Sequence, residues 1–194
     1  MKIIHGECDI GKLTNLPNVA MLDLMDTPYI TIREFEDGDW PAVWAVLEPV
    51  FRTGETYPYP TDISEDEARK AWVETPQKTY VALEGERIVG TYYIKPNQPG
   101  QGSHVCNCGY VTAPDQRGRG IGTGMCGHSL EEGRRLGFKA MQYNMVVSNN
   151  EDALHVWQKM GFKVTGRLPK AFNHPKAGLV DAVVMYLWIG ELNS

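Results

Sequence analysis

A loop rich in glycine and arginine is the segment of this sequence best suited to chemistry. Residues 111–123 read Val-Thr-Ala-Pro-Asp-Gln-Arg-Gly-Arg-Gly-Ile-Gly-Thr. A predicted strand ends at Thr112, Pro114 blocks its continuation, and a helix is predicted to begin inside the glycines. Glycines let backbone N–H groups approach a ligand closely, and a helix N-terminus adds unpaired donors and positive potential. The loop is therefore either a diphosphate site or a tight turn with two solvated arginines.

Two common phosphate-binding motifs do not fit this loop. A Walker loop needs Gly-Lys followed by Ser or Thr, whereas Gly120 is followed by Ile121 and Gly122. A dinucleotide fingerprint, G-x-G-x-x-G, that begins at Gly118 needs a third glycine where this chain has Thr123. The spacing excludes both the P-loop NTPases and the dinucleotide-binding proteins.

Two asparagines are candidates for holding a second substrate. Asn107 lies in a predicted strand at 103–112, on a face where a core strand would prefer an apolar side chain. Asn144 has a similar position in a predicted strand at 139–147. We predict a catalytic, positioning role for both and a substrate contact for Asn107. A buried amide that is bonded to neighbouring backbone is an equal alternative for each.

A proline-rich loop at 53–60 is a candidate wall for the same substrate. Its tyrosines, Tyr57 and Tyr59, are held by flanking prolines. A stiff loop of this kind lines an acceptor pocket, or it is a connector whose rings are partly buried. We predict that Tyr57 and Tyr59 contact the substrate.

The cysteines do not indicate a metal site. Cys106 and Cys108 form C-x-C, with His104 two residues before them, and Cys8 and Cys126 stand alone. On one strand face, successive positions lie about 7 Å apart, too far for one tetrahedral ion. We predict reduced thiols in a cytosolic protein and no metal.

Periodicity and turn residues predict a chain that begins with antiparallel strands and continues with strands and helices in alternation. Ser64 and Glu67 have the spacing of a capping box, Asp37 or Asp39 is placed to cap an earlier helix, and Glu84-Gly85-Glu86 reads as a hairpin turn. The predicted strands are 29–35, 79–84, 87–95, 103–112, 139–147, 162–168 and 180–189, and the predicted helices lie near 40–50, after 64, from the glycines to 136, and at 151–160. The fold class is therefore a mixed α/β sheet.

Length and composition set the broad class. The 194 residues, 42% apolar and 22% charged, suit one globular domain, which we place at 29–194, with residues 1–28 as an N-terminal extension. A net charge of −5 argues against a nucleic-acid surface or a basic membrane-binding face. No apolar run approaches the roughly 20 residues of a membrane span, and the first residues lack a secretory apolar core. We expect a cytoplasmic protein with no nucleic-acid or membrane partner.

Two motifs together resemble the GCN5-related N-acetyltransferases. Arg117-Gly-Arg-Gly120-Ile-Gly122 looks like the pyrophosphate motif R-x-x-G-x-G of that family. Asn150-Glu-Asp-Ala153, followed by a helix that ends in Gly161-Phe162, resembles its second signature. The resemblance covers about 29–190. It implies the GNAT fold, an α/β fold with a mixed, mostly antiparallel sheet and a splayed parallel strand pair.

The resemblance also implies a function and a cofactor. Acetyl-CoA is the expected co-substrate, lying between the splayed strands while a neutral amine attacks the thioester directly. A backbone N–H near Val111 would polarise the thioester carbonyl. The residues implied for cofactor binding are Val111, Thr112, Ala113, Arg117, Gly118, Arg119, Gly120, Ile121, Gly122, Thr123 and Asn150.

Two departures from the family weaken the catalytic prediction. Trp157 stands where many members carry a tyrosine taken as the acid, and the strand at 103–112 has no carboxylate. Catalysis by positioning is therefore expected, with solvent handling the protons. The alternatives are a non-catalytic acyl-CoA-binding module and an acetyltransferase for protein N-termini or lysines.

A narrower resemblance bears on the acceptor. Residues 90–97, with Ser103-His104, Cys106-Asn107 and the loop at 54–58, look like fungal N-acetyltransferases that act on proline analogues such as azetidine-2-carboxylate. A small amine, an amino or imino acid, is thus the leading acceptor class. The sequence leaves monomer and homodimer open.

Overall fold

The computed structural model describes residues 30–191. The predicted N-terminal extension and Cys8 lie outside the described residues. The elements, in chain order, are β1 (Thr31–Glu34), α1 (Trp40–Thr53), α2 (Glu65–Arg69), β2 (Lys78–Glu84), β3 (Arg87–Pro96), β4 (Val105–Thr112), α3 (Ile121–Arg135), β5 (Ala140–Val147), α4 (Glu151–Lys159), β6 (Lys163–His174) and β7 (Gly178–Trp188). Short helical turns at Asp37–Asp39, Lys70–Glu74, Gly100–Gly102 and Pro114–Gln116 connect some of them.

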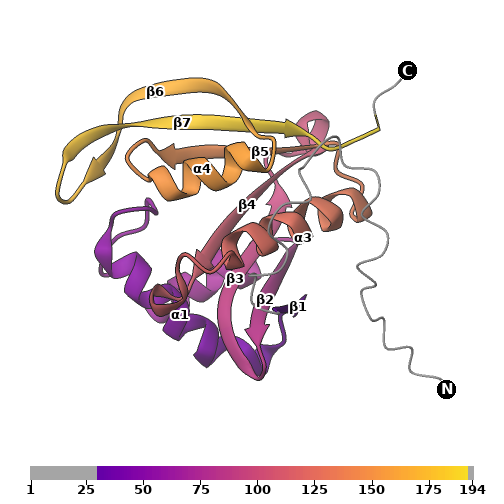
Figure 1. Ribbon diagram of the computed structural model, residues 1–194, viewed down its shortest axis with the longest axis vertical. Coiled ribbons are helices and arrows are strands. Elements are labelled where there is room, and N and C mark those ends of the chain that lie inside the picture. Colours follow the sequence, from indigo (N-terminus) through magenta and orange to yellow (C-terminus); the bar gives the residue numbers. More distant parts are fainter. Residues whose placement is uncertain (1–29, 192–194) are drawn as a thin grey trace.

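A seven-stranded sheet, in the order β1-β2-β3-β4-β5-β7-β6, forms the centre of the molecule (Figure 1). Every neighbouring pair is antiparallel except β4 and β5, which run parallel. That parallel pairing covers only Val105 with Ala140 and Cys106 with Met141. Beyond Cys106, β4 stays with β3 and β5 stays with β7, so the sheet splits. The predicted fold, mostly antiparallel with a splayed parallel pair, is confirmed.

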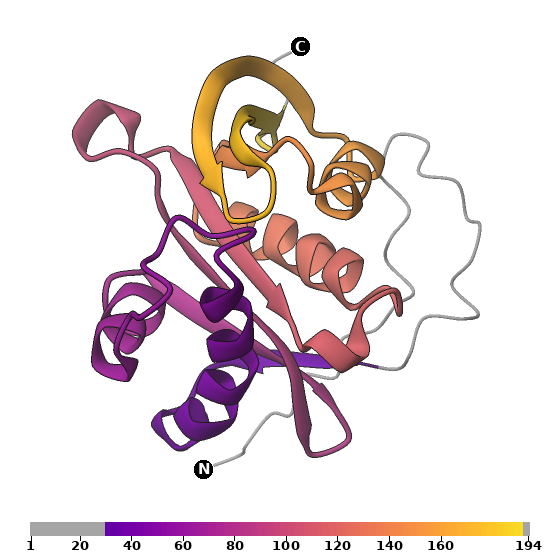
Figure 2. The ribbon, with the colours of Figure 1, turned by 90° about the vertical axis from the view of Figure 1, so that its left-hand side faces the viewer.

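Helices cover both faces of the sheet (Figure 2). α1 packs on β3 and β4 from one side, while α3 packs on β3, β4 and β5 from the other, together with α4. The predicted apolar stripe of α1 is confirmed, because Val43, Leu47 and Val50 are all buried. Successive side chains of a strand point to opposite faces, so each central strand contributes to both cores.

Of the two helix caps predicted from the sequence, the structure confirms only one. The capping box of α2 is confirmed, since the Ser64 side chain accepts from the N–H of Glu67 and the Glu67 carboxylate accepts in return. Asp39 precedes α1, yet its carboxylate makes no cap. It accepts from Arg33 and from the N–H of Glu36 instead. The predicted acidic cap of α1 is therefore wrong, because the charged guanidinium is a stronger partner than a helix N–H.

The β-hairpins agree with the turn residues. Glu84 pairs with Arg87 around a turn in which Gly85 has φ +60°. β6 is longer than predicted: the expected strand ended at Leu168, but the strand continues through Pro169 to His174 across a register shift. Proline is tolerated there because β6 is the edge strand, so its missing N–H leaves no gap in a central ladder.

None of the helices between residues 30 and 191 is both long and apolar enough to cross a membrane. Within the same range, no cluster of three or more His, Cys, Asp or Glu side chains is arranged to hold a metal ion.

Candidate active site

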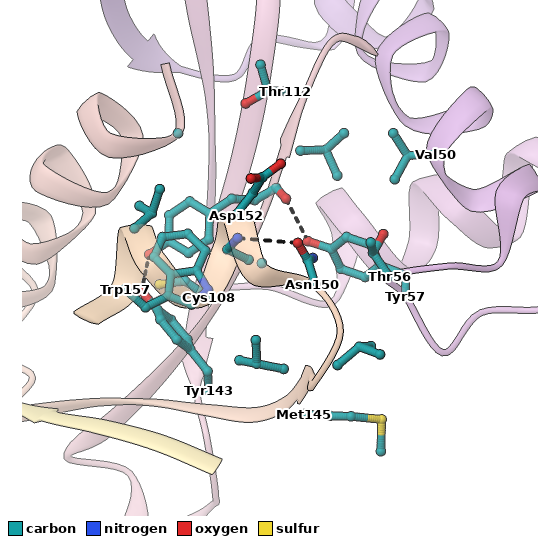
Figure 3. Close-up of a pocket in the computed structure, with 18 of the residues that line it drawn as sticks. Val50, Thr56, Tyr57, Cys108, Thr112, Tyr143, Met145, Asn150, Asp152 and Trp157 are labelled. Atoms are coloured by element: carbon teal, nitrogen blue, oxygen red, sulfur yellow. Dashed lines mark hydrogen bonds between the residues drawn. The ribbon is translucent and has the colours of Figure 1, made fainter. Parts of the chain in front are cut away.

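The split between β4 and β5 opens a cleft of about 780 Å³. Its walls come from both strands, the glycine loop, the first turns of α3 and α4, and the loop that follows α1 (Figure 3). Of the residues predicted to bind cofactor or substrate, those that line it are Tyr57, Tyr59, Asn107, Val111, Thr112, Arg117, Gly118, Gly120, Ile121, Gly122, Thr123, Asn144 and Asn150. The structure thus brings together thirteen of the predicted residues, counted from that lining, around one space.

The backbone of β4 presents unpaired groups to the split. The N–H of Asn97 donates to the Val105 carbonyl at 2.8 Å, and the N–H of Ala113 donates to the Val89 carbonyl at 2.9 Å. Because antiparallel pairs alternate, the odd residues of β4 bond to β3 and the even residues face β5. The backbone of Val111 therefore points toward β3, as does that of Ala113, which is not in the cleft lining. The N–H groups of Tyr110 and Thr112 are the ones that face the gap.

The glycine loop has the geometry of an anion cradle. Gly118 and Gly120 have φ of +76° and +78°, a left-handed conformation that favours glycine. α3 begins directly afterwards with no side-chain cap, and its first intrahelical bond here runs from the N–H of Gly124 to the Gly120 carbonyl. The N–H groups of residues 121–123 are therefore free of intrahelical partners and directed at the cleft end of the helix.

The two arginines of the loop have different roles. Arg117 is exposed and lines the cleft. Arg119 does not line it: its guanidinium pairs with Glu84 at 2.6 Å and bonds to the Gln116 side chain. Gln116 is buried, so this pairing fixes the loop to the β2–β3 turn. The structure places Arg119 as a loop-holding residue and leaves Arg117 as the loop's cation at the cleft.

α4 closes the far wall. The Asn150 side chain accepts from the N–H of Ala153 at 3.3 Å, and so caps the helix while lining the cleft. Trp157 is half-buried, with its ring centre 4.9 Å from that of Tyr110 and 5.0 Å from that of Tyr143. Its indole N–H donates hydrogen bonds but is no proton source for a leaving group.

The loop after α1 forms the opposite wall (Figure 3). The Tyr57 hydroxyl donates to the Tyr110 carbonyl at 2.9 Å, which ties the loop to the split edge of β4. The rings of Tyr57 and Tyr59 stack, 5.9 Å apart and 5° from parallel. Thr56 lines the same wall, and its hydroxyl oxygen is buried without a hydrogen-bond partner among the described residues.

A salt bridge holds this loop from outside. Lys176, in the turn between β6 and β7, lies 2.5 Å from the carboxylate of Glu55, the residue before Thr56. Pro175 packs near Gly54 in the same contact. Figure 2 shows this turn reaching down to the loop after α1, so the first and last parts of the domain meet beside the cleft.

The two predicted asparagines differ in their surroundings. Asn107 is buried: its amide N–H donates to the Gln142 carbonyl at 2.9 Å, and its carbonyl oxygen accepts from Tyr93 at 3.3 Å. It therefore bridges β4 and β5 just where their backbone pairing stops. Asn144 is exposed at an irregularity of β5 and donates to the Asn97 side chain at 2.6 Å.

The lining residues that sequence reasoning missed include Tyr93, Lys95, Tyr110 and Tyr143. Tyr93 crosses β4 at Gly109, where a Cβ would lie only 2.6 Å from its ring. The hydroxyl of Tyr110 lies 3.0 Å from that of Tyr143. Strand alternation was the available signal for two of them. Tyr93 and Lys95 share one face of β3, and their register partners on β4 are Gly109 and Asn107.

The titratable side chains deep in the cleft remain neutral. Burial raises the pKa of the Tyr57, Tyr93, Tyr110 and Tyr143 phenols above their ordinary value. Burial likewise raises the pKa of the Cys108 thiol. These groups can donate hydrogen bonds but cannot act as bases near neutral pH. The cleft is suited to positioning two ligands that enter from opposite faces of the sheet, one of them anionic.

Comparisons with known proteins agree with this architecture. The family model described as the acetyltransferase (GNAT) family matches residues 40–162. The N-acetyltransferase aca1 of Schizosaccharomyces pombe is 29% identical in an alignment of 148 positions that covers 68% of this chain and 71% of that protein. A GCN5-related N-acetyltransferase from Kribbella flavida is 37% identical, with a TM-score of 0.78 over 82% of this chain and 97% of that one. A phosphinothricin acetyltransferase of the GNAT superfamily from Sinorhizobium meliloti, solved in complex with acetyl-CoA, shares the fold at 19% identity, with a TM-score of 0.74 over 84% and 90% of the two chains.

Proposed function

This chain belongs to the acetyltransferase (GNAT) family and is an acetyl-CoA-dependent N-acetyltransferase; from that premise we propose that its acceptor is the amine of a small molecule, an amino or imino acid. One observation carries the proposal: the split between β4 and β5 connects an anion cradle to a tyrosine-walled pocket. An acetyl donor and a compact acceptor fit such a cleft from opposite sides.

The cradle suits the diphosphate of acetyl-CoA. Gly118 and Gly120, the two left-handed glycines, carry no Cβ that would block the approach of a ligand, and the free N–H groups at the start of α3 supply donors. We assign these N–H groups, Arg117, the backbone of Thr112 and the side chain of Asn150 to cofactor binding. When bound, acetyl-CoA supplies an activated acetyl thioester. The N–H groups of Tyr110 and Thr112, which face the gap, are placed to stabilise negative charge on a carbonyl oxygen there.

The proton donors and bases available in the cleft favour catalysis by positioning. The reaction forms a C–N bond, breaks a C–S bond and moves one proton from nitrogen to sulfur in net terms. Trp157 cannot supply that proton, and the phenols and the thiol that line the cleft are kept neutral by burial. Holding the amine against the thioester contributes roughly 7–11 kcal/mol of barrier lowering in favourable cases, and solvent carries the proton.

We assign the acceptor to the pocket of Tyr57, Tyr59, Asn107 and Asn144. The amide nitrogen of Asn107 carries two N–H groups, of which one bonds to Gln142. The second is available to the acceptor. The segments that resemble proline-analogue acetyltransferases, at 54–58 and 90–97, run along this same pocket and support an imino acid.

A screen for release of free CoA thiol tests the proposal. The purified chain is mixed with acetyl-CoA and, in separate wells, amino acids, imino acids, polyamines and peptides. We expect thiol release with small amino or imino acids. Release with peptides alone would identify a protein acetyltransferase, and tight acetyl-CoA binding with no release for any amine would identify a non-catalytic binding module.

A further inference from the structure

Lys95 has an unusual place for a charged side chain. It lies on β3 directly opposite Asn107, is half-buried and lines the cleft. Its ammonium nitrogen is 5.2 Å from the centre of the Tyr93 ring. Among residues 30–191, no carboxylate lies within ion-pair distance of it. Lysines are rarely buried without a partner, and an aromatic face is only a weak one.

The charge is isolated at one end of the cleft. The other charged residues in the lining, Arg117 and Asp152, belong to the glycine loop and α4. At the acceptor end, where the walls are tyrosine, asparagine, threonine and valine, Lys95 is the one charged side chain that the described residues contribute. A protein of net charge −5 thus keeps an unpaired cation in its acceptor pocket.

The geometry directs this cation toward the split. Tyr93 is two residues from Lys95 on the same face of β3, and its ring lies across Gly109 of β4. The Lys95 nitrogen lies beside that ring. The side chain therefore extends along the sheet, from the level of its register partner Asn107 toward Gly109. One residue further, about 3.4 Å along an ideal strand, is Tyr110, whose N–H faces the gap. A group bound by Lys95 is thus a short step from the place of acyl transfer.

Two further polar groups in the lining of the same cleft have hydrogen-bonding capacity to spare. The Thr56 hydroxyl is buried and unpaired among the described residues, and one N–H of Asn107 is free of the bonds to Gln142 and Tyr93. The Lys95 ammonium and the spare Asn107 N–H belong to register partners, and together they form a donor set for an anion. A carboxylate accepts several such hydrogen bonds at once, and charge assistance strengthens them.

We infer that Lys95 is a specificity-determining residue that binds the carboxylate of a free amino or imino acid acceptor, an inference that rests on the proposed function. In an α-amino acid, the amine and the carboxylate are attached to the same carbon, so anchoring the carboxylate fixes the amine close to the split. A peptide N-terminus carries a neutral amide at that point, and a simple amine carries nothing. Lys95 therefore selects free amino acids against both.

The test compares matched acceptors on matched variants. L-Proline is paired with pyrrolidine and L-leucine with isoamylamine, so that each pair differs by the carboxylate alone. Wild type, Lys95→Gln and Lys95→Arg are compared, and Lys163→Gln, an exposed lysine on β6, controls for loss of charge elsewhere. Calorimetry measures the affinity of each acceptor for the CoA-saturated protein, and thiol release measures kcat/KM with acetyl-CoA.

We expect Lys95→Gln to weaken the binding and the kcat/KM of a carboxylate-bearing acceptor by roughly 10- to 100-fold. The values for its carboxylate-free partner should stay within about twofold, and Lys95→Arg should retain most of the selectivity. Equal losses for both members of a pair, or wild-type preference for the simple amines, would overturn the inference. If the proposed function itself were wrong, no acceptor would cause thiol release in any variant. The affinities measured by calorimetry would still decide whether Lys95 binds a carboxylate.

Discussion

The hydroxyl of Tyr57 donates a 2.9 Å hydrogen bond to the backbone carbonyl of Tyr110, a residue 53 positions further along the chain. That carbonyl belongs to the even-numbered set of β4 that faces the split, where no strand is present to pair with it. The loop that follows α1 is thus fastened to the edge of β4 that faces the cleft.

Replacing Tyr57 by Phe should therefore loosen both the fold and the acceptor site. The part-buried carbonyl of Tyr110 loses its partner, so the free energy of unfolding should fall by about 1–2 kcal/mol. The acceptor KM should rise several-fold while acetyl-CoA affinity stays constant. Urea unfolding and steady-state kinetics measure the two effects. Tyr59→Phe is the matched control, because the Tyr59 hydroxyl makes no hydrogen bond within residues 30–191; an equal effect of both variants would contradict the assigned role of Tyr57.

Gly120→Asp should abolish cofactor binding. The new carboxylate would stand in the cradle where the diphosphate approaches, and like charges in contact repel. We expect acetyl-CoA affinity to fall by roughly 100-fold or more, measured by calorimetry. Gly85→Asp is the control, since Gly85 has a similar φ of +60° in the β2–β3 turn, outside the cleft lining. Both variants should lose about 1 kcal/mol of stability from left-handed strain, but only Gly120→Asp should lose affinity.

Trp157→Phe should lower turnover only modestly. The phenyl ring keeps the packing against Tyr110 and Tyr143, and no proton donor is removed. Loss of a general acid would instead cost roughly 10²–10⁴-fold in kcat. Kinetics at saturating acetyl-CoA measure the difference, and a loss of that size with unchanged cofactor affinity would show that position 157 supplies the proton.

The dependence of activity on pH should come from the acceptor. The attacking amine must be neutral, so kcat/KM should rise with pH as the acceptor loses its proton. Burial raises the pKa of the Tyr57 and Tyr93 phenols and of the Cys108 thiol above their ordinary values. All three groups therefore stay neutral near neutral pH and cannot act as the base. Changing to an acceptor with a lower pKa should shift the rising limb downward by about the same amount. A limb that stays fixed across acceptors would identify a base in the protein.

The local part of this site could be predicted from the sequence. Pro114 and the alternating glycines after a strand mark a turn that opens a helix, because each residue's own backbone preference determines the geometry. The capping box at Ser64 and the hairpin at Gly85 were predictable for the same reason. The position of the split was available only through the family resemblance.

The contacts across the cleft could not be predicted in this way. Arg119 looked like a ligand-binding cation, but Glu84, 35 residues earlier, pairs with it because the β2–β3 turn folds beside the loop. Lys95 was not among the predicted site residues, and only its register with Asn107 shows that it lies at the cleft. Periodicity determines which face a side chain takes; long-range pairing determines what it meets there.

Asn107→Ala tests whether the buried amide at the split serves the acceptor or only the fold. Two partners lose a bond in this variant, the Gln142 carbonyl and the Tyr93 hydroxyl, so stability should fall by about 1–3 kcal/mol on either account. If the spare N–H also holds the acceptor, the acceptor KM should rise and kcat should fall, while acetyl-CoA affinity stays nearly constant. Asn107→Asp is the informative companion, because it keeps an acceptor for Tyr93 but places a negative charge beside Lys95.

The Asn107→Asp variant separates a role in acceptor binding from a role in the fold, because it adds a negative charge at the same position. A carboxylate at position 107 would pair with the Lys95 ammonium across the β3–β4 register and compete with the acceptor carboxylate for it. Binding of L-proline should then weaken more in Asn107→Asp than in Asn107→Ala. Melting temperature and acceptor KM, measured on one preparation of each variant, decide the matter. An acceptor KM that is unchanged in both variants would confine Asn107 to bridging β4 and β5.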